Sequence, residues 1–495
     1  MAFSDDTFDL VKSLTANEKR FFRLFASTQG ENKNYIRVFN ALDKMKSYDP
    51  KKLNQSLAGH RLNISYEKNY LQHNLLRAMR NFHADGTELK KIKYILLNIE
   101  LLFQKRLLSL TQRSIDKAIA VAEKYEYRLE HLELLDWQYR LYLRTGNYKK
   151  SGAYRQDVMP IVEKLLEELA IEAEEKSIIY RIIEIDRRRG SSISGIERKE
   201  LVKLHAALKK MHLKAGKSFQ LAELSVSYLD MSAKILGRHK ESLGYCHELL
   251  LLYKSHPHFK IERPGKYCVA LIHTSERLYT LKKYDEALQL ANEAEVFYKE
   301  LKSLKQNEMY HELFTFASQM RIRIAIATKQ YAQAANTSVE FERSWNYDNP
   351  KMAKDTRWFA KLHVARAHFF NGQFARSLKD ITTFLNNVEL AATQRDALEY
   401  LHLLRLLIYH DMQAFDLLES MCRNTLRLFE KNNNDEFARK LINGIKQSGN
   451  AHNDILKRRK IFSDLAKELP RMETNVGEKE DFLIWITATR DALNK

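Results

Sequence analysis

The sequence predicts an all-α fold in which helical hairpins repeat along most of the chain. The first observation is a pattern that recurs seven times: a turn, an aromatic or apolar anchor, and in most copies a small residue three positions later. The anchors are Tyr148, Ile196, His239, Tyr284, Tyr331, Phe374 and Phe415. Successive anchors lie 41 to 48 residues apart. A period of this length is typical of a repeat array.

The second observation is a composition that suits long helices. The 495 residues include only 15 glycines and 6 prolines, and 29% of them are charged. These counts fall well below the usual shares of about 7% glycine and 5% proline. Few helix breakers and many charges favour long helices with solvated outer faces.

The cysteines and the hydropathy pattern indicate a cytoplasmic protein. The three cysteines all fall in helical patterns, which predicts reduced, buried thiols rather than a disulfide framework. The acidic opening segment lacks the apolar core of a signal peptide. The longest apolar stretch, near Leu249–Tyr253, is too short to span a bilayer, so we expect no membrane partner.

The net charge is the main clue to a partner. The 82 basic and 63 acidic residues give a formal charge of +19. Such a surplus favours anionic partners, either nucleic acid or acidic protein. The alternative is that the basic side chains lie on solvated helix faces, because lysine and arginine alternate with glutamate in most segments.

The first 86 residues are expected to form a separate helical module. Thr15 and Glu18 form a capping box that begins a helix ending at Ser27. A second helix is expected over 35–45. Pro50 occupies the first position of a short third helix, and a long fourth helix follows over 65–82.

A short helix, a turn and a longer helix is the order of a helix-turn-helix module. Basic side chains off the apolar stripe would then contact phosphates and bases. The candidate nucleic-acid contacts are Lys51, Lys52, Arg61, Lys68, Arg77 and Arg80. The turn is long for this motif and no wing strands follow, so a helical cap with a basic surface is the alternative interpretation.

The body of the chain, residues 88–445, repeats one hairpin. Over 266–281 apolar residues recur every three or four positions, which predicts a helix with one buried face. A turn precedes Tyr284, and Ala287, Ala291 and Ala294 line a second helix. These small residues allow the two helices to approach closely, and Tyr284 fills the corner between them.

The corner and the alanine-rich second helix resemble the tetratricopeptide repeat (TPR) family, most closely at Tyr284–Ala294 and Tyr331–Ala335. The period here exceeds the family's value of about 34 residues, so the peptide-clamp residues of that family are not carried over. The resemblance implies an α-solenoid of about eight hairpins with a concave surface lined by the first helix of each pair. Residues 446–495 are expected to cap its end with further helices, including one over 481–493.

No motif for catalysis, a cofactor or a metal stands in a suitable context. Gly216-Lys217-Ser218 lacks the upstream glycine of a phosphate-binding loop, because Met211 occupies that position. Cys246-His247 has no second ligand pair at zinc spacing. We therefore expect a non-enzymatic protein without a cofactor or a metal ion.

The leading hypothesis is a scaffold or adaptor that binds a protein or peptide segment, with acidic or phosphorylated residues, in a basic concave groove. The candidate groove residues are Arg144, Arg181, Tyr228, Arg277, Arg321 and Arg366, with Tyr142, Arg188, Lys234, His273, Arg323 and His363 also on first helices. The alternative is a nucleic-acid-binding regulator whose repeat domain acts as a sensor. A third hypothesis is structural assembly by end-to-end stacking of the solenoid.

Overall fold

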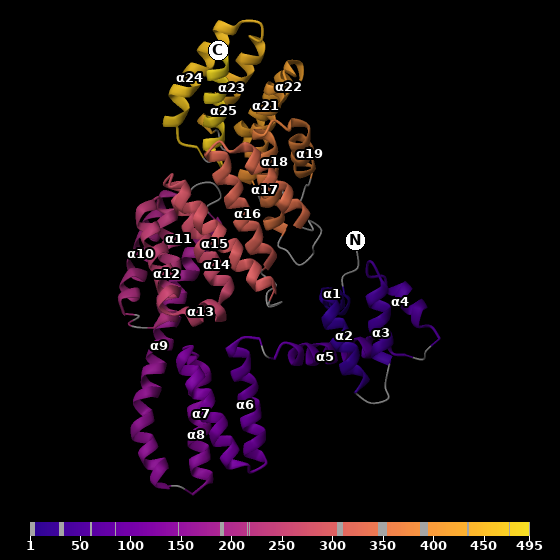
Figure 1. Cartoon of the computed structure of the whole chain (residues 1–495), viewed down its shortest axis with the longest axis vertical. Helices are drawn as coiled ribbons and strands as arrows, with labels where there is room; N and C mark the ends of the chain where they lie inside the picture. The colour runs from indigo at the N-terminus through magenta and orange to yellow at the C-terminus, as the bar shows by residue number, and fades with distance from the viewer. Residues whose placement is uncertain are drawn as a thin grey trace. The chain divides into compact units, whose positions relative to one another are not determined.

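The structure, a computed structural model, describes residues 5–28, 34–59, 62–84, 86–146, 148–188, 193–214, 216, 218–303, 310–344, 354–386, 395–432, 435–474 and 476–494. Every regular element in these ranges is a helix (Figure 1), which confirms the all-α prediction. The chain divides into two compact units, Met1–Leu166 and Glu167–Lys495. The expected boundaries near residues 87 and 446 stay predictions.

The first unit begins with five helices: α1 (Asp6–Ser13), α2 (Ala16–Ser27), α3 (Asn34–Lys44), α4 (Pro50–Leu57) and α5 (Ile64–Phe82). The Thr15–Glu18 capping box is present at the start of α2, and Asp49 caps α4 with Pro50 in its first turn. The four helices expected from the sequence are confirmed to within two residues at each end. The sequence interpretation missed α1.

These five helices enclose one hydrophobic cluster. Phe22, Phe39, Leu71 and Leu75 are fully buried in it. Helix α5 packs against α1, α2 and α3, and α4 packs against α3. Helix α5 is therefore the centre of the bundle. Only its outward face is accessible to a partner.

A second cluster of the first unit forms between the next helices. They are α6 (Glu88–Gln104), α7 (Leu108–Lys124) and α8 (Arg128–Arg144), and α9 (Tyr148–Arg188) then runs across the boundary between the units. Ile99, Ile115 and Leu134 are fully buried between α6, α7 and α8. A hairpin over 97–125 is expected from the sequence, and the structure places its corner at Arg106.

The second unit contains the rest of the hairpins. Its helices are α10 (Gly195–Lys214), α11 (Phe219–Ile235), α12 (His239–Ser255), α13 (Pro257–Glu262), α14 (Pro264–Thr280), α15 (Tyr284–Ser303), α16 (Tyr310–Ala327), α17 (Tyr331–Ser344), α18 (Lys354–Phe370), α19 (Phe374–Leu385), α21 (Arg395–Asp411), α22 (Phe415–Asn432), α23 (Glu436–Asn450), α24 (Ile455–Glu468) and α25 (Lys479–Leu493). The anchors His239, Tyr284, Tyr331, Phe374 and Phe415 each begin the second helix of a hairpin.

The recurring corner has a single backbone geometry. Two residues before each helix start, one residue adopts a left-handed conformation, at Arg106, Glu126, Gly146, Gly237, Lys282, Lys329, Gly372 and Gln413. The next amide donates to a carbonyl five residues back, as Lys283 N does to Leu278 O at 2.9 Å. This is the Schellman ending of a helix, followed at once by the next helix.

One copy of the pattern does not fit this geometry. The side chain of Ile196 is 82% exposed, so it fills no corner. Helix α10 is started instead by a reciprocal cap, in which Ser194 Oγ accepts from Glu197 N at 3.2 Å and donates to Glu197 Oε2 at 2.7 Å. The interpretation of Ile196 as a corner anchor is wrong.

The small residue after the anchor brings the two helices of a pair together. Ala287, Ala334 and Ser377 are fully buried. Ser275 on α14 donates to the carbonyl of Ala287 at 2.7 Å, and Ser377 on α19 donates to that of Ala365 at 2.8 Å. Such contacts need backbones close together, which a larger residue at the same position would prevent.

The first helices of successive hairpins form a continuous row, which we call the inner row and define as α11, α14, α16, α18 and α21. Helix α14 packs against α16, α16 against α18, and α18 against α21, in addition to their own hairpin partners. An ion pair links α11 to α14. Helices that stay in contact across successive pairs lie on the inside of a curved stack, which is the concave side of an α-solenoid.

The C-terminal helices close the stack. Phe482, Trp485 and Ile486 of α25 are buried in the last hydrophobic cluster, as the sequence predicts. Helix α25 packs against α24 and also contacts α16 of the inner row. Helix α25 therefore covers the open end of the stack and also contacts the inner row.

The left-handed corners predict whether a substitution to or from glycine raises or lowers the free energy of unfolding. Gly372 has φ +72° with open space around its missing Cβ, so Gly372→Ala should lower the free energy of unfolding by about 1 kcal/mol through backbone strain alone. Lys282→Gly, at φ 61°, should raise it by a similar amount.

Gly244 lies inside α12 with open space around it, and provides the matched control. Gly244→Ala should stabilise by about 0.5–1 kcal/mol, because alanine favours a helix interior. The measurement is urea unfolding followed by circular dichroism. If Gly372→Ala and Gly244→Ala changed the free energy of unfolding in the same direction, the left-handed conformation of Gly372 would be contradicted.

Candidate functional site

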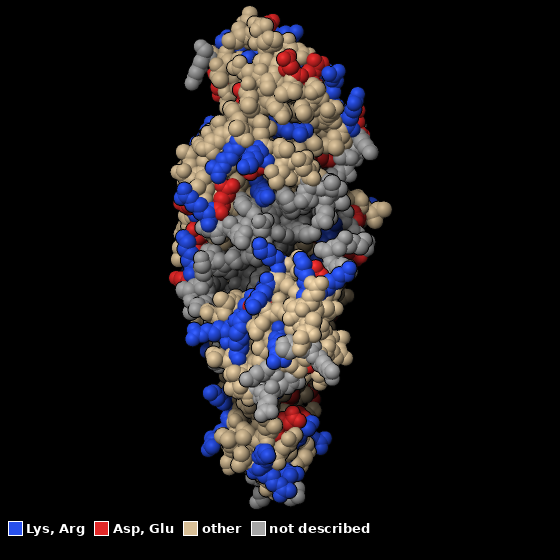
Figure 2. All heavy atoms as spheres, turned by 90° about the vertical axis from the view of Figure 1, so that its right-hand side faces the viewer, with Lys and Arg blue, Asp and Glu red and all other residues tan. Residues whose placement is uncertain are grey.

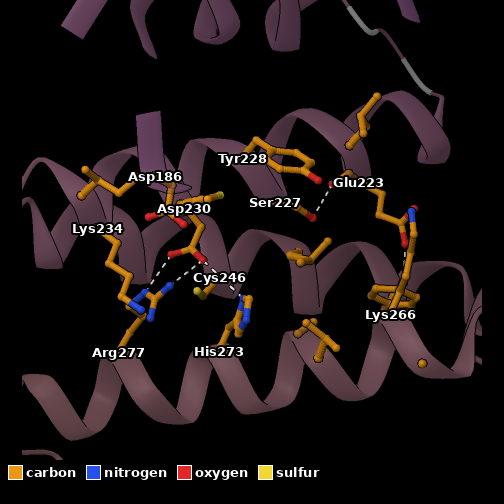
Figure 3. A pocket seen from close by; sticks show the side chains of 18 residues that line it. Asp186, Glu223, Ser227, Tyr228, Asp230, Lys234, Cys246, Lys266, His273 and Arg277 are labelled. Carbon is orange, nitrogen blue, oxygen red and sulfur yellow. Dashed lines mark hydrogen bonds and ion pairs between the residues drawn. The ribbon is translucent and has the colours of Figure 1, made fainter. Parts of the chain in front are cut away.

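A cavity of about 480 Å³ opens on the inner row, between α11 and α14 and with α12 as its floor. Half-buried apolar side chains line it: Leu224, Tyr228 and Met231 from α11 and Val269 from α14. Figure 3 shows Glu223, Ser227 and Tyr228 on one helix and Lys266, His273 and Arg277 on the facing one. The cavity thus has an apolar middle and charged groups at both ends.

One end of the cavity is fixed by a buried ion pair. Arg277 Nε and Nη2 contact the two carboxylate oxygens of Asp230 at 2.9 and 3.0 Å. Ser242 donates to Asp230 Oδ1 at 2.5 Å. Burial alone would lower the pKa of Arg277, but the carboxylates of Glu276 and Asp230 raise it, so this guanidinium stays charged.

The other end is organised around Glu223, which is almost completely buried. Its Oε2 accepts from Arg263 at 2.6 Å and from Lys266 at 2.9 Å, and its Oε1 accepts from Tyr253. A buried carboxylate with several donors is satisfied by the protein itself. Glu223 therefore serves to hold the cationic groups at this end in place.

Two lysines and a histidine at the cavity keep much of their side-chain surface in solvent, and Asp186 of α9 also lines the cavity. The side chains of Lys234, Lys266 and His273 are 41%, 57% and 50% exposed. The surrounding wall desolvates His273 and lowers its pKa, so the ring is neutral at pH 7 and can donate or accept a hydrogen bond. These groups, unlike Arg277, have surface left for a ligand.

The ion pairs continue along the inner row as a ladder, which we define as Asp230, Glu276, Arg277, Arg323, Arg366, Glu478 and Asp481. Glu276 on α14 accepts from Arg277 at 2.6 Å and from Lys234 at 3.2 Å, and Arg323 on α16 lies 3.9 Å away. Burial would raise the pKa of Glu276, but Lys234, Arg277 and Arg323 together lower it strongly.

The far half of the ladder binds the segment that begins α25. Glu478 lies 3.0 Å from Arg323 and 2.9 Å from Arg366. Arg366 on α18 donates to both carboxylate oxygens of Asp481, at 2.7 and 2.9 Å, and Tyr400 on α21 donates to Asp481 at 2.5 Å. The inner row therefore already holds one acidic helical turn, its own.

The cavity brings together two of the six groove residues expected from the sequence, Tyr228 and Arg277. Arg277 and Arg366 are buried in the ladder, so their guanidiniums face carboxylates of the chain and not an open groove. This corrects their expected placement on a free surface. The physical reason is that a buried charge must be paired, and Asp230 and Asp481 pair these two.

The other three are not among the residues that line the cavity. Arg181 on α9 is bound to Glu184 and Glu200, both contacts being 2.6 Å. Arg321 on α16 pairs with Glu295 of α15. Arg144, in the first unit, lies over the ring of Phe103 at 5.6 Å. Of the candidates in the second unit, Tyr228 and Arg277 line the cavity, whereas Arg181, Arg321 and Arg366 do not.

Sequence reasoning missed Met231, Lys266 and the acidic partners Glu223 and Asp230. The signal that could have found the acidic pair is their position on α11, where both fall within an otherwise apolar pattern. Charged residues on a buried face need partners of opposite charge, and these mark a polar site inside a core.

The nucleic-acid candidates of the first unit have different surroundings. Lys51, Lys52, Arg77 and Arg80 are exposed. Lys68 forms an ion pair with Asp5 and donates to Tyr48 at 3.2 Å. Arg61 lies outside the described residues.

Two tyrosines share the outward face of α5 with these arginines. Tyr66 and Tyr70 are 61% and 38% exposed, and their rings stack in parallel, with centroids 6.4 Å apart. Residues 66, 70, 77 and 80 recur at helical spacing and so lie on one side of α5. These rings and guanidiniums form an exposed stripe on α5, and the guanidinium of Arg77 also lies 6.0 Å from the ring centroid of Phe25.

Basic side chains are distributed along the face of the molecule drawn in Figure 2, with acidic ones among them at fewer places. This distribution fits charged, solvated helix faces over much of the surface. Within the described residues, no helix combines the length and apolar character that crossing a bilayer requires.

No protein-family model matches this chain, and no curated protein matches it in sequence. Among solved structures, a signal-transduction ATPase with numerous domains and a TPR sensor, from Pyrococcus horikoshii, is 12% identical over 80% of this chain and 68% of that one, with a TM-score of 0.31. The TPR domain of P58(IPK) is 10% identical over 82% of this chain and 99% of that one, with a TM-score of 0.22. Scores this low carry no argument about function, and the solenoid rests on the helices described above.

The ladder predicts a large effect for one arginine. Arg366→Met should lower the free energy of unfolding by about 3–5 kcal/mol, because Asp481 is then buried without its guanidinium. Adding Asp481→Asn should recover part of this loss, with a coupling energy of about 1–3 kcal/mol. Chemical unfolding of the four chains of this double-mutant cycle measures both quantities.

Arg427→Met on the exposed side of α22 is the control and should change stability by less than about 0.5 kcal/mol. If Arg366→Met were as mild as Arg427→Met, the ladder would not be a stabilising element of the fold.

Proposed function

We propose that this chain is a binding scaffold that holds a segment of a partner protein on the inner row of its second unit, at the cavity between α11 and α14. The observation that carries the proposal is the cavity itself. It is large enough for one or two side chains, it has an apolar middle, and it lies on the side where a solenoid receives extended or helical segments.

The chemistry of the cavity defines the segment. Leu224, Tyr228, Met231 and Val269 favour an aliphatic or aromatic side chain in the middle. Lys234 and Lys266 keep two-fifths or more of their side chains in solvent at opposite ends. An acidic residue next to the apolar one would gain a charge-assisted hydrogen bond from either lysine.

The start of α25 illustrates how the same row binds an acidic segment. Glu478 and Asp481 contact Arg323 and Arg366, and the next residue, Phe482, is fully buried against Tyr400 with ring centroids 5.3 Å apart. We expect the cavity to bind a segment of the same kind, in which acidic residues precede an aromatic one. The cavity lies along the ladder from this docked turn, at its Asp230–Arg277 end.

A displayed library of random peptides, panned against the full chain, tests this proposal. Enriched peptides should carry an apolar residue beside an acidic one. Met231→Arg should lower their affinity by at least about tenfold, because a charged side chain then fills the apolar middle. Fluorescence anisotropy of labelled peptides measures the dissociation constants.

Leu251→Arg is the matched control, because Leu251 is 63% exposed on α12 and does not line the cavity. It should leave peptide binding unchanged. Peptides that bind the two variants equally well, or no enrichment at all, would count against the cavity as the binding site.

The exposed stripe of α5 supports a second candidate function, a nucleic-acid-binding regulator. Two stacked tyrosines beside Arg77 and Arg80 offer ring faces and guanidiniums to bases and phosphates. Exposed Lys51 and Lys52 on α4 add positive charge to the same unit. Lys68 contributes less, since Asp5 already neutralises it.

Arg77→Glu combined with Arg80→Glu should weaken binding of a labelled DNA duplex by the full chain. The slope of log affinity against log salt should fall by about 2, one for each lost phosphate contact. Arg113→Glu combined with Lys117→Glu on α7 has the same charge change and should act less. Equal effects of the two double variants would show a general charge effect, and no binding at low salt would end this candidate.

A further inference from the structure

A second polar cluster lies away from the cavity, where three consecutive helices of the second unit meet. Glu342 on α17, His368 on α18 and Asp380 on α19 place one potential ligand atom each within 4.8 Å of one another. Two of the three residues are carboxylates, and one of them, Glu342, is ion-paired with Arg376 of α19.

The histidine of this cluster has one ring nitrogen without a hydrogen-bond partner in the described part of the chain. His368 is fully buried, and its Nδ1 is 2.7 Å from Gln373 Oε1. The amide oxygen is an acceptor, so Nδ1 carries the proton and Nε2 keeps its lone pair. Among the described residues, Nε2 has no hydrogen-bond partner. An acceptor that fixes the tautomer in this way is the usual companion of a metal-binding histidine.

The carboxylates are also incompletely satisfied. Asp380 Oδ2 is buried and has no hydrogen-bond partner among the described residues. Arg376 donates to Glu342 Oε2 at 2.5 Å, which leaves Oε1 of Glu342 for another ligand. Buried polar atoms of native proteins are normally paired, so unpaired ones from two adjacent residues call for an ion or a ligand.

We propose that Glu342, His368 and Asp380 bind one divalent transition-metal ion, with Zn²⁺ as the best match. One imidazole nitrogen and two carboxylate oxygens are a ligand set for such ions, whereas Mg²⁺ and Ca²⁺ prefer oxygen alone. Ligands at about 2.1 Å from a common ion lie closer to one another than 4.8 Å, so the three side chains need to close by roughly an ångström. Glu342 is 22% exposed, which leaves room for water at the remaining position.

Isothermal titration of the chelator-treated full chain with ZnCl₂ tests the proposal, and Co²⁺ absorption in the visible range reports a site with nitrogen and oxygen ligands. The wild-type chain should bind one equivalent at this site. His368→Gln and Asp380→Asn should each lower the affinity by at least about tenfold. Gln373→Leu should also weaken binding, because it removes the acceptor that fixes the tautomer.

Thermal unfolding with and without Zn²⁺ separates a lost site from a lost fold. In the absence of metal, Asp380→Asn should unfold at the wild-type temperature or above it, because it removes an uncompensated carboxylate. Zn²⁺ should raise the unfolding temperature of the wild type and not of this variant.

Asp416→Asn, on the exposed side of α22, is the matched control and should bind Zn²⁺ like the wild type. Two results would overturn the proposal. One is a folded wild-type chain that binds no Zn²⁺ at micromolar concentration. The other is undiminished binding by His368→Gln and Asp380→Asn, which would place the ion elsewhere.

Discussion

The bidentate contact between Arg366 and Asp481 is the interaction on which the second unit depends most. Arg366 is completely buried, and a buried guanidinium without a carboxylate is one of the costliest defects that a core can contain. Asp481 lies 115 residues further along the chain, at the start of α25. The inner row can therefore exist in its present form only when the last helix has folded back onto α18 and α21. The hairpins and the C-terminal helix are one structure, although repeat arrays are often treated as sums of independent units.

The same constraint explains why we propose a binding surface at the cavity and not over the whole inner row. Next to α16, α18 and α21, the chain's own Glu478 and Asp481 form ion pairs with Arg323 and Arg366. Between α11 and α14 the ladder closes on itself, with Asp230 facing Arg277, while Lys234, Lys266 and His273 keep open surface. The inner row thus has two parts. At α16, α18 and α21 its arginines are paired with acidic residues of the chain, whereas the side chains around the cavity between α11 and α14 keep surface for a ligand.

Local chemistry made the fold predictable, and long-range pairing made the site hard to predict. The corner needs only a left-handed residue, an anchor and a small residue, so its copies at Tyr284, Tyr331 and Phe374 can be read from the sequence. The pattern also predicts that Tyr228 and Arg277 lie on inward-facing first helices, but it does not reveal that Arg277 is buried against Asp230, 47 residues earlier in the chain. The sequence predicts an open groove at Arg366, because nothing near this residue in sequence reveals Asp481. Neither Glu342 nor Asp380 forms a motif with His368, since three separate helices supply them.

Helix α18 connects the ladder to the proposed metal site. Arg366 and His368 are two residues apart, which in a helix turns their side chains by about 200°, so they point to opposite sides. One side contacts the C-terminal turn through Asp481, and the other faces α17 and α19 through the cluster. An ion bound by Glu342, His368 and Asp380 would fix the rotation of α18 about its own axis. The rotation of α18 sets the direction in which the guanidinium of Arg366 points toward Asp481, so the two sides of this helix would depend on each other.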